Sequence, residues 1–356
     1  MNAELIALRS RPYPHELRTG LRRLAGGEPA TAAQFVRTAR RLGELHADLA
    51  AGLVHEHLPP DSSLDFVVAH GQTIFHAGTE HLSRQLLDPW PIVRQLNVPV
   101  CYDLRQADLI AGGQGAPIMP LADWVLFRAP SHARVIVNLG GICNLTRLPR
   151  GDDPMPRESI DGGDIGPCNL LIDGVVRRLF PDREFDKDGH IAAQADWPTI
   201  HATKSHPMLD TVAAVMSDHG PLNTLGREQF SDPWLDELVD RLAPTTAAAD
   251  LVGWAVETVA RTIASAIAAF HASDVVLAGG GALNPNLVQR IRERLAIELD
   301  HAPRVYSSDE MGIPAGAREA MGMAVLGGLC LDGEPITTKR VTGAVSPGRA
   351  GAWVYP

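Results

Sequence analysis

The chain contains 356 residues, more than one typical globular core holds, so two domains are expected. Its hydrophobic fraction (45%) and charged fraction (21%) are those of ordinary globular proteins. A formal net charge of −10 argues against nucleic-acid binding as the main function. The four cysteines show no C-x-x-C spacing, and no apolar run has the length of a membrane span or the pattern of a signal peptide. We therefore expect a cytoplasmic protein that binds neither nucleic acid nor membrane.

The first 60 residues contain two expected elements. The apolar run at residues 3–8 predicts a short strand. Thr31 is the expected N-cap of a long amphipathic helix, because a threonine oxygen accepts a hydrogen bond from a backbone amide in the first helical turn. Apolar residues then recur at helical spacing, at Phe35, Val36, Ala39, Leu42, Leu45, Leu49 and Leu53.

Two buried strands are expected next, and each ends in polar residues. Residues 64–69 lead into His70-Gly71-Gln72-Thr73, and residues 98–102 lead into Asp103. Ligands of α/β sheets bind where strands end at the carboxyl edge. The first cluster, together with His76, fits either a polar site facing a cleft or a turn with solvated histidines, and no third metal ligand has a suggestive spacing.

Asp103 has the residue type and the position of a general base, which takes a proton from a hydroxyl group or a water molecule. The alternative is a surface salt bridge with Arg105. The run Gly112-Gly113-Gln114-Gly115-Ala116-Pro117 favours the first interpretation, because a loop so rich in glycine has little packing role and allows close approach to a polar ligand.

The proline-bearing linker at residues 128–131 is the expected domain boundary. We predict an N-terminal lobe at residues 1–131 and a C-terminal lobe at residues 132–332, with the irregular tail 333–356 as a candidate return to the first lobe. Strands alternate with helices in both halves, which indicates two α/β lobes.

The second half contains further regular elements and one surface turn. Asp250 is the expected N-cap of a helix, and Asn284 caps another with Pro285 at its first position. The helix after Asp250 has apolar positions at Val252, Val256, Val259, Ile263, Ile267 and Phe270. The other expected elements are a turn at residues 149–158, a helix at 169–180, a strand at 274–278 and a last helix at about 316–331.

Two glycine-rich junctions each follow a β-branched run. The first is Asn138-Leu139-Gly140-Gly141-Ile142-Cys143-Asn144, and the second is Gly279-Gly280-Gly281 before the helix capped by Asn284. Glycine lets the backbone pass close to a ligand, and a helix N-terminus favours an anion. Two such junctions predict a nucleotide held between two lobes, and hence a phosphotransferase. No Walker loop is present in the sequence.

Asp164, in the run Asp161-Gly162-Gly163-Asp164-Ile165-Gly166-Pro167, is a candidate to hold Mg²⁺ through water, since Mg²⁺ favours one or two carboxylates plus phosphates. The alternative is an Asx turn, which the same residue types form. The run Leu225-Gly226-Arg227-Glu228 fits either a charged clamp or a helix start.

Eight blocks in order together resemble the anhydro-N-acetylmuramic acid kinases of bacterial cell-wall recycling. The resemblance extends from the first residues to about residue 345. The eight blocks are His70-Gly71-Gln72-Thr73, Asp103-Leu104-Arg105, Gly112-Gly113-Gln114-Gly115-Ala116-Pro117, Asn138-Leu139-Gly140-Gly141-Ile142-Cys143-Asn144-Leu145, Asp164-Ile165-Gly166-Pro167, Asp186-Lys187-Asp188-Gly189, Gly226-Arg227-Glu228 and Gly279-Gly280-Gly281.

The resemblance implies the two-lobed, actin-like (ribonuclease H-like) ATPase fold with a central cleft. It implies an enzyme that uses ATP and Mg²⁺ to open the 1,6-anhydro bond of anhydro-N-acetylmuramate with water and to phosphorylate O6, and that is often a homodimer. Asp103 matches the catalytic base, and Asp164 the phosphate or Mg²⁺ side. Positions matching the sugar side are His70, Gln72, Arg105, Gln114 and Glu319. Positions matching the nucleotide side are Asn138, Gly140, Gly141, Asn144, Asp164, Gly166, Gly279, Gly280, Gly281 and Asn284.

The sequence departs from the family pattern in three places. Family members begin with a Met-Ser-Gly-Thr-Ser-x-Asp-Gly phosphate loop, whereas this sequence begins with Met1-Asn2-Ala3-Glu4. We expect the true start to lie upstream and the chain as written to turn over ATP poorly; the alternative is a degenerate, non-catalytic sugar- or nucleotide-binding relative. Cys168 and Leu87 each replace a usual glycine, and the second replacement affects the expected sugar contacts.

Overall fold

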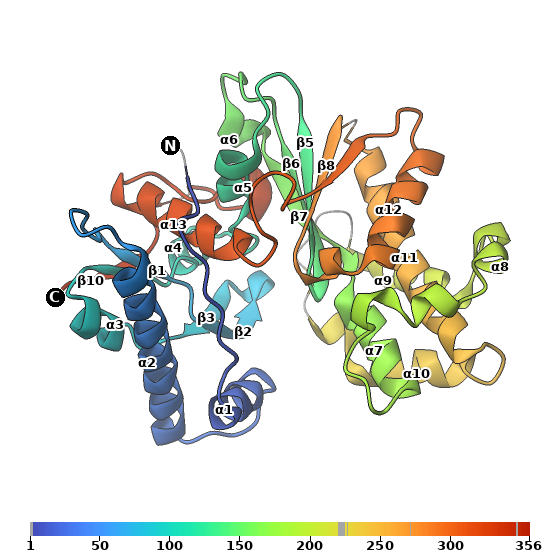
Figure 1. Cartoon of the computed structure of the whole chain (residues 1–356), viewed down its shortest axis with the longest axis horizontal. Coiled ribbons are helices and arrows are strands. Elements are labelled where there is room, and N and C mark those ends of the chain that lie inside the picture. The colour runs from blue at the N-terminus through green and yellow to red at the C-terminus, as the bar shows by residue number, and fades with distance from the viewer. Residues whose placement is uncertain (1–2, 220–224, 226, 271, 347) are drawn as a thin grey trace. The chain divides into compact units, whose positions relative to one another are not determined.

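A computed structural model describes residues 3–219, 225, 227–270, 272–346 and 348–356 (Figure 1). The chain folds into two compact units. Unit 1 comprises Met1–Leu126 together with Glu319–Pro356, and unit 2 comprises Phe127–Arg318. Each unit has its own sheet and its own buried apolar core, and each is described separately below.

Unit 1 combines a three-stranded sheet with a separate two-stranded hairpin. The strands of the unit are β1 (Val67–Ala69), β2 (Gln72–Ala77), β3 (Leu82–Leu86), β4 (Val100–Tyr102) and β10 (Ala352–Val354). In the three-stranded sheet, β4 lies in the centre, parallel to β1 and antiparallel to β10, and β2 and β3 form the hairpin. Its helices are α1 (His15–Ala25), α2 (Ala32–His57), α3 (Trp90–Leu96), α4 (Gln106–Ile110), α5 (Pro120–Phe127), α13 (Arg318–Leu331) and α14 (Lys339–Thr342).

The predicted helix after Thr31 is confirmed as α2. Thr31 accepts from the Gln34 amide at 3.2 Å, and the Gln34 side chain accepts from the Thr31 amide at 2.8 Å, which forms a complete capping box. Val36 is 62% exposed, so this apolar position does not belong to the buried face. The predicted strand at residues 3–8 is wrong: the segment pairs with no strand in the part of the chain that the structure describes, and Ile6 and Leu8 stay exposed.

Unit 2 is built on a five-stranded mixed sheet. Its strands are β5 (Arg134–Leu139), β6 (Ile142–Leu148), β7 (Asp161–Pro167), β8 (Asp274–Ala278) and β9 (Arg304–Ser307). They lie in the order β7-β6-β5-β8-β9. β6 runs antiparallel to β5 and β7, whereas β8 and β9 run parallel to β5. Numbered along the chain, this order is 3-2-1-4-5 with the second strand reversed, which is the ribonuclease H-like topology.

Helix α11 is the centre of the core of unit 2. Its expected apolar positions Val252, Val256, Val259, Ile263 and Ile267 are all buried. Among the described helices it alone is apolar and long enough to cross a membrane, and most of that stretch is buried against the rest of the unit, as in a core helix. The helices of unit 2 are α6 (Pro156–Ser159), α7 (Asn169–Leu179), α8 (Trp197–Ala202), α9 (Pro207–His219), α10 (Asp232–Leu242), α11 (Ala248–Ala268) and α12 (Pro285–Glu298).

Three sequence expectations change at element ends. Asp250 is not an N-cap, because the alanine-rich segment before it is already helical from Ala248 and its carboxylate accepts the Asp196 amide at 2.7 Å. The predicted turn at residues 149–158 already includes the start of α6. The tail 333–356, expected to be irregular, contains α14 and the sheet strand β10. The cap by Asn284 and Pro285 is confirmed.

Candidate active site

Two predicted site residues, His70 and Asp103, lie at the same edge of the sheet in unit 1. Strands β1 and β4 are parallel, and Ala69 is paired with Tyr102, so His70 and Asp103 directly follow adjacent strand ends. Asp103 adopts a left-handed backbone conformation with a φ of 55°. Such a turn is uncommon for a residue other than glycine and is frequent at functional sites.

The Asp103 carboxylate is poorly solvated and incompletely bonded. Its Oδ1 atom is buried and has no hydrogen-bond partner among the described residues. Burial raises the pKa of Asp103, and the positive charge of Arg84 opposes that rise. A carboxylate with an unbonded oxygen and a raised pKa is suited to accept a proton from a water molecule.

His70 and Arg105 form a fixed pair beside this strand edge. The Arg105 Nε–H donates to His70 Nε2 at 3.2 Å, while His70 Nδ1 bonds the carbonyl of Gly71 at 3.0 Å. Burial and the Arg105 charge lower the pKa of His70 to about 4, so the imidazole is neutral at pH 7. Arg105 also donates to the carbonyl of Gly115 at 2.7 Å, which links the pair to the glycine loop at residues 112–117. Burial lowers its own pKa to about 10.

Asp108 anchors the glycine loop from inside. This carboxylate is 2% exposed, and its Oδ2 accepts from the Gly115 amide at 2.8 Å. Its Oδ1 accepts from the hydroxyls of Thr337 and Thr342, the second at 2.6 Å. A Cβ on Gly113 would lie 2.2 Å from Asp108 Oδ2, so only glycine fits there. Asp108 therefore holds the loop rigidly.

The remaining predicted sugar-side residues lie at element ends. Gln72 begins β2, and Glu319 lies exposed in the first turn of α13, where its charge favours the protonated form of Arg105. Gln114 is fixed through its backbone, whose amide donates to the carbonyl of Thr342 at 2.8 Å. None of these three side chains forms a hydrogen bond with another described residue, so all three remain available for a ligand.

In unit 2, three predicted polar residues form one row across the sheet. Asn138 of β5 is paired with Asn144 of β6, and Asn144 is paired with Asp164 of β7. Because directly paired residues point to the same face, these side chains share one face of the sheet. The next strand, β8, contributes Ala278 to the same row, immediately before the second glycine loop.

Asp164 is a largely buried carboxylate within this row. Its Oδ2 accepts from the Leu225 amide at 2.8 Å. Burial raises its pKa to about 6, and this hydrogen bond acts in the opposite direction. Gly226, from the predicted clamp, lies outside the described residues. Within the described residues no group of three or more His, Cys, Asp or Glu side chains is arranged to hold a metal ion.

The second glycine junction, Gly279-Gly280-Gly281, packs directly onto the end of β5. Gly279 has a φ of +84°, and a Cβ there would lie 2.6 Å from Asn138 Oδ1. A Cβ on Gly281 would lie 2.8 Å from the Leu139 Cβ atom. Gly280 is different, because its nearest neighbour would be Asn169 Nδ2 at 3.9 Å. Two of the three glycines are therefore required by close packing, and the middle one is not.

The first glycine junction is the two-residue turn between β5 and β6, and it caps helix α7. The carbonyl of Gly140 accepts from the Asn169 amide at 3.0 Å, and that of Gly141 accepts from the Cys168 amide at 2.9 Å. The Asn169 side chain donates to the carbonyl of Leu139 at 3.1 Å. Asn169 is therefore bonded to the first glycine junction, and a Cβ on Gly281 of the second junction would lie 3.0 Å from its Oδ1. Sequence reasoning missed this residue as part of the site, although it lies two residues after the block that ends at Pro167.

Gly166 and Asn284 have clear local roles. Gly166 has a φ of +143°, and a Cβ there would lie 3.0 Å from Thr262 Cγ2. Asn284 Oδ1 accepts from the amides of Asn286 and Leu287 at 3.1 and 3.2 Å, which caps α12. This oxygen is therefore already used by its own helix. A contact between Asn284 and a nucleotide stays a prediction.

The Asp186-Lys187-Asp188-Gly189 block supports the start of α12. Asp186 is 5% exposed and accepts from the amides of Ile191 and Ala192 at 2.8 and 3.0 Å. A Cβ on Gly189 would lie 2.5 Å from Asn284 Oδ1, so glycine is needed for this contact. The block thus has a structural role beside the glycine loop.

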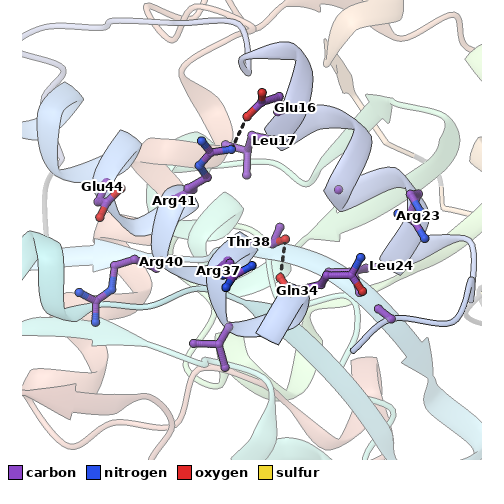
Figure 2. Close-up of a pocket in the computed structure, with 13 residues that line it drawn as sticks. Glu16, Leu17, Arg23, Leu24, Gln34, Arg37, Thr38, Arg40, Arg41 and Glu44 are labelled. Carbon is purple, nitrogen blue, oxygen red and sulfur yellow. Dashed lines mark hydrogen bonds and ion pairs between the residues drawn. The ribbon is translucent and has the colours of Figure 1, made fainter. Parts of the chain in front are cut away.

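The 630 Å³ cavity of unit 1 lies between α1 and α2 and contains no predicted site residue (Figure 2). Four arginines line it, and three of them are paired: Arg41 with Glu16 at 2.5 Å, Arg40 with Asp88 at 2.5 Å and Arg23 with Glu28 at 2.9 Å. The glycine loop and Asp103 belong to a different part of the unit.

The sheet order of unit 2 and the glycine loops after β5 and β8 place the protein in the class of actin-like ATPases. The sequence profile of the family described as "Anhydro-N-acetylmuramic acid kinase" matches residues 1–356. The chain belongs to this family.

Individual proteins show the same relationship. An anhydro-N-acetylmuramic acid kinase of Prochlorococcus marinus (strain MIT 9303) is 32% identical over 355 residues, which cover 96% of this chain and 88% of that protein. One of Parasynechococcus marenigrum (strain WH8102) is 32% identical, covering 99% and 92%. Among solved structures, a ROK family glucokinase from Streptomyces griseus in complex with glucose and AMPPNP is 14% identical, with a TM-score of 0.36 over 84% of this chain and 88% of that chain.

Proposed function

We propose that the protein is an ATP-dependent kinase that hydrolyses the 1,6-anhydro bond of anhydro-N-acetylmuramate and phosphorylates O6. The observation that supports this most directly is Asp103, which follows the carboxyl end of a parallel strand and whose buried Oδ1 has no hydrogen-bond partner among the described residues. Membership of the kinase family indicates the substrates, and Asp103 is a base of the kind that the reaction needs.

In the proposed reaction, Asp103 removes a proton from a water molecule, and that water oxygen forms a bond to C1 of the sugar. The C1–O6 bond breaks, and O6 forms a bond to the γ-phosphorus of ATP as ADP leaves. The products are N-acetylmuramate 6-phosphate, ADP and one proton, which Asp103 releases to solvent. Neutral His70 and buried Arg105 hold the strand edge and the glycine loop in place around the sugar.

Unit 2 supplies the features expected of a phosphate site. Glycine loops allow the backbone to approach the nucleotide closely, and Asn138 and Asn144 offer amide groups on the same face. Asp164 has one oxygen bonded to the Leu225 amide, and its other oxygen has no bond to a described residue. One such carboxylate fits Mg²⁺, which takes its other ligands from phosphates and water. When bound, Mg²⁺ would neutralise charge on the transferring phosphoryl group.

The test is release of ADP by the purified chain with 1,6-anhydro-N-acetylmuramate, ATP and Mg²⁺. We expect ADP and sugar phosphate in equal amounts, and no ADP release when the anhydro sugar is replaced by N-acetylmuramate, which has no anhydro bond. Binding of the sugar without any turnover, both by this chain and by one extended upstream by the family's phosphate loop, would instead support the non-catalytic relative.

A further inference from the structure

Arg84 is an exposed cation of β3 whose guanidinium makes no hydrogen bond or ion pair with another described residue. Its cross-strand neighbour is Phe75 of β2, which is 51% exposed. Directly paired residues of a hairpin share a face. The hairpin therefore presents an unpaired guanidinium and an exposed aromatic ring side by side.

This pair lies close to the catalytic segment of unit 1. The Gln106 side chain, three residues after Asp103, donates to the carbonyl of Ser83 at 2.8 Å. That bond fixes β3, and Arg84 with it, against the start of α4. The electrostatic effect of Arg84 on Asp103 agrees with this placement.

The substrate of the proposed function has a chemical group that suits such a cation. Muramate differs from glucosamine by a lactyl ether at O3, which ends in a carboxylate. A guanidinium binds a carboxylate through two parallel hydrogen bonds, and an aromatic ring covers the apolar face of a sugar. Arg105 is less suited to this role, because each of its three nitrogens already has a partner in His70 or Gly115.

We propose that Arg84 binds the lactyl carboxylate of the sugar and so selects muramate over carboxylate-free anhydro sugars, with Phe75 packing beside it. The proposal rests on the proposed function. It makes Arg84 a specificity-determining residue that contributes to substrate binding, while Asp103 performs the proton transfer.

The experiment compares Arg84→Gln with the unaltered chain on two sugars, 1,6-anhydro-N-acetylmuramate and 1,6-anhydro-N-acetylglucosamine. We expect kcat/KM for the first sugar to fall about 10- to 100-fold, mainly through KM, and that for the second to change less than about twofold. Arg84→Lys should recover part of the loss. Arg18→Gln, which removes another exposed and unpaired arginine of unit 1, should change neither value.

Equal losses on both sugars, or no loss on either, would overturn the role of Arg84. Calorimetric binding of both sugars provides a second readout that does not need turnover. If the unaltered chain binds the sugars but neither it nor a chain extended upstream by the family's phosphate loop turns them over, the proposed kinase reaction fails. The Arg84 proposal is then still decided by whether Arg84→Gln weakens binding of the muramate alone by the same factor.

Discussion

Asp103 has three properties that are seldom combined at one residue: a left-handed backbone, a buried unbonded oxygen and a position at a strand end. We predict that Asp103→Asn lowers turnover by about 10²- to 10⁴-fold, because an amide cannot accept the water proton. ATP affinity, measured by calorimetry, should change little. Near-normal turnover by this variant would mean that another group is the base.

The same residue sets an expectation for pH. Burial raises the pKa of Asp103, and the base acts only when it is deprotonated. Turnover should therefore fall as the pH falls through this raised pKa, above the pH at which an ordinary aspartate protonates. A kcat/KM profile without an acidic limb above pH 4, roughly the ordinary pKa of aspartate, would contradict this assignment.

Asp164 predicts a pH dependence of stability. Burial raises its folded-state pKa from 3.8 to about 6, so the folded state binds this proton more tightly than the unfolded state. The contribution of Asp164 to the free energy of unfolding is therefore fully present below about pH 4. It is lost as the pH rises through 6, and the loss amounts to about 3 kcal/mol at most. Asp164→Asn should remove that loss.

The measurement for Asp164 is urea unfolding of both proteins at pH 4.5 and 6.5. The asparagine oxygen can still accept the Leu225 amide, so the variant keeps the local hydrogen bond. The difference in unfolding free energy between variant and parent should grow with pH. A constant difference would show that Asp164 does not titrate in this range.

At the scale of elements, the loop after β8 offers a matched pair of substitutions. Gly279→Ala places a Cβ 2.6 Å from Asn138 Oδ1 at a φ of +84°, whereas Gly280→Ala meets nothing closer than 3.9 Å. The first should cost about 1–3 kcal/mol of stability and weaken ATP binding, through backbone strain. Urea unfolding and calorimetry measure these effects. Equal effects of both substitutions would contradict the packing argument.

Periodicity and caps predicted many elements of this fold, and tertiary contacts decided the others. The helical spacing after Thr31 and the buried positions of α11 were readable because one face must be apolar. The run at residues 3–8 has the composition of a strand but no partner, and a strand exists only where another one pairs with it.

The sequence indicated the candidate site where a reactive side chain directly follows a predicted strand, as at Asp103. Asp108 and Asn169 were harder to identify, because their roles depend on bonds to Thr342 and Leu139, which are distant in sequence. Arg84 gave no signal, since its significance arises from the turn that pairs β2 with β3.

At the scale of the whole molecule, the expected residues divide between the two units. Unit 1 contains the proposed base and the sugar-side residues, and unit 2 contains the two glycine junctions and Asp164. A kinase that binds its two substrates through different units needs both of them in one chain. We therefore propose one coupled reaction, in which water attacks the sugar and the sugar oxygen attacks ATP.

Running the reaction in ¹⁸O-labelled water tests this claim most directly. Mass spectrometry of the sugar phosphate should find ¹⁸O in the hydroxyl at C1 and none in the phosphate ester, because water bonds to carbon and O6 bonds to phosphorus. Label in the phosphate, or an unlabelled C1 hydroxyl, would contradict the account.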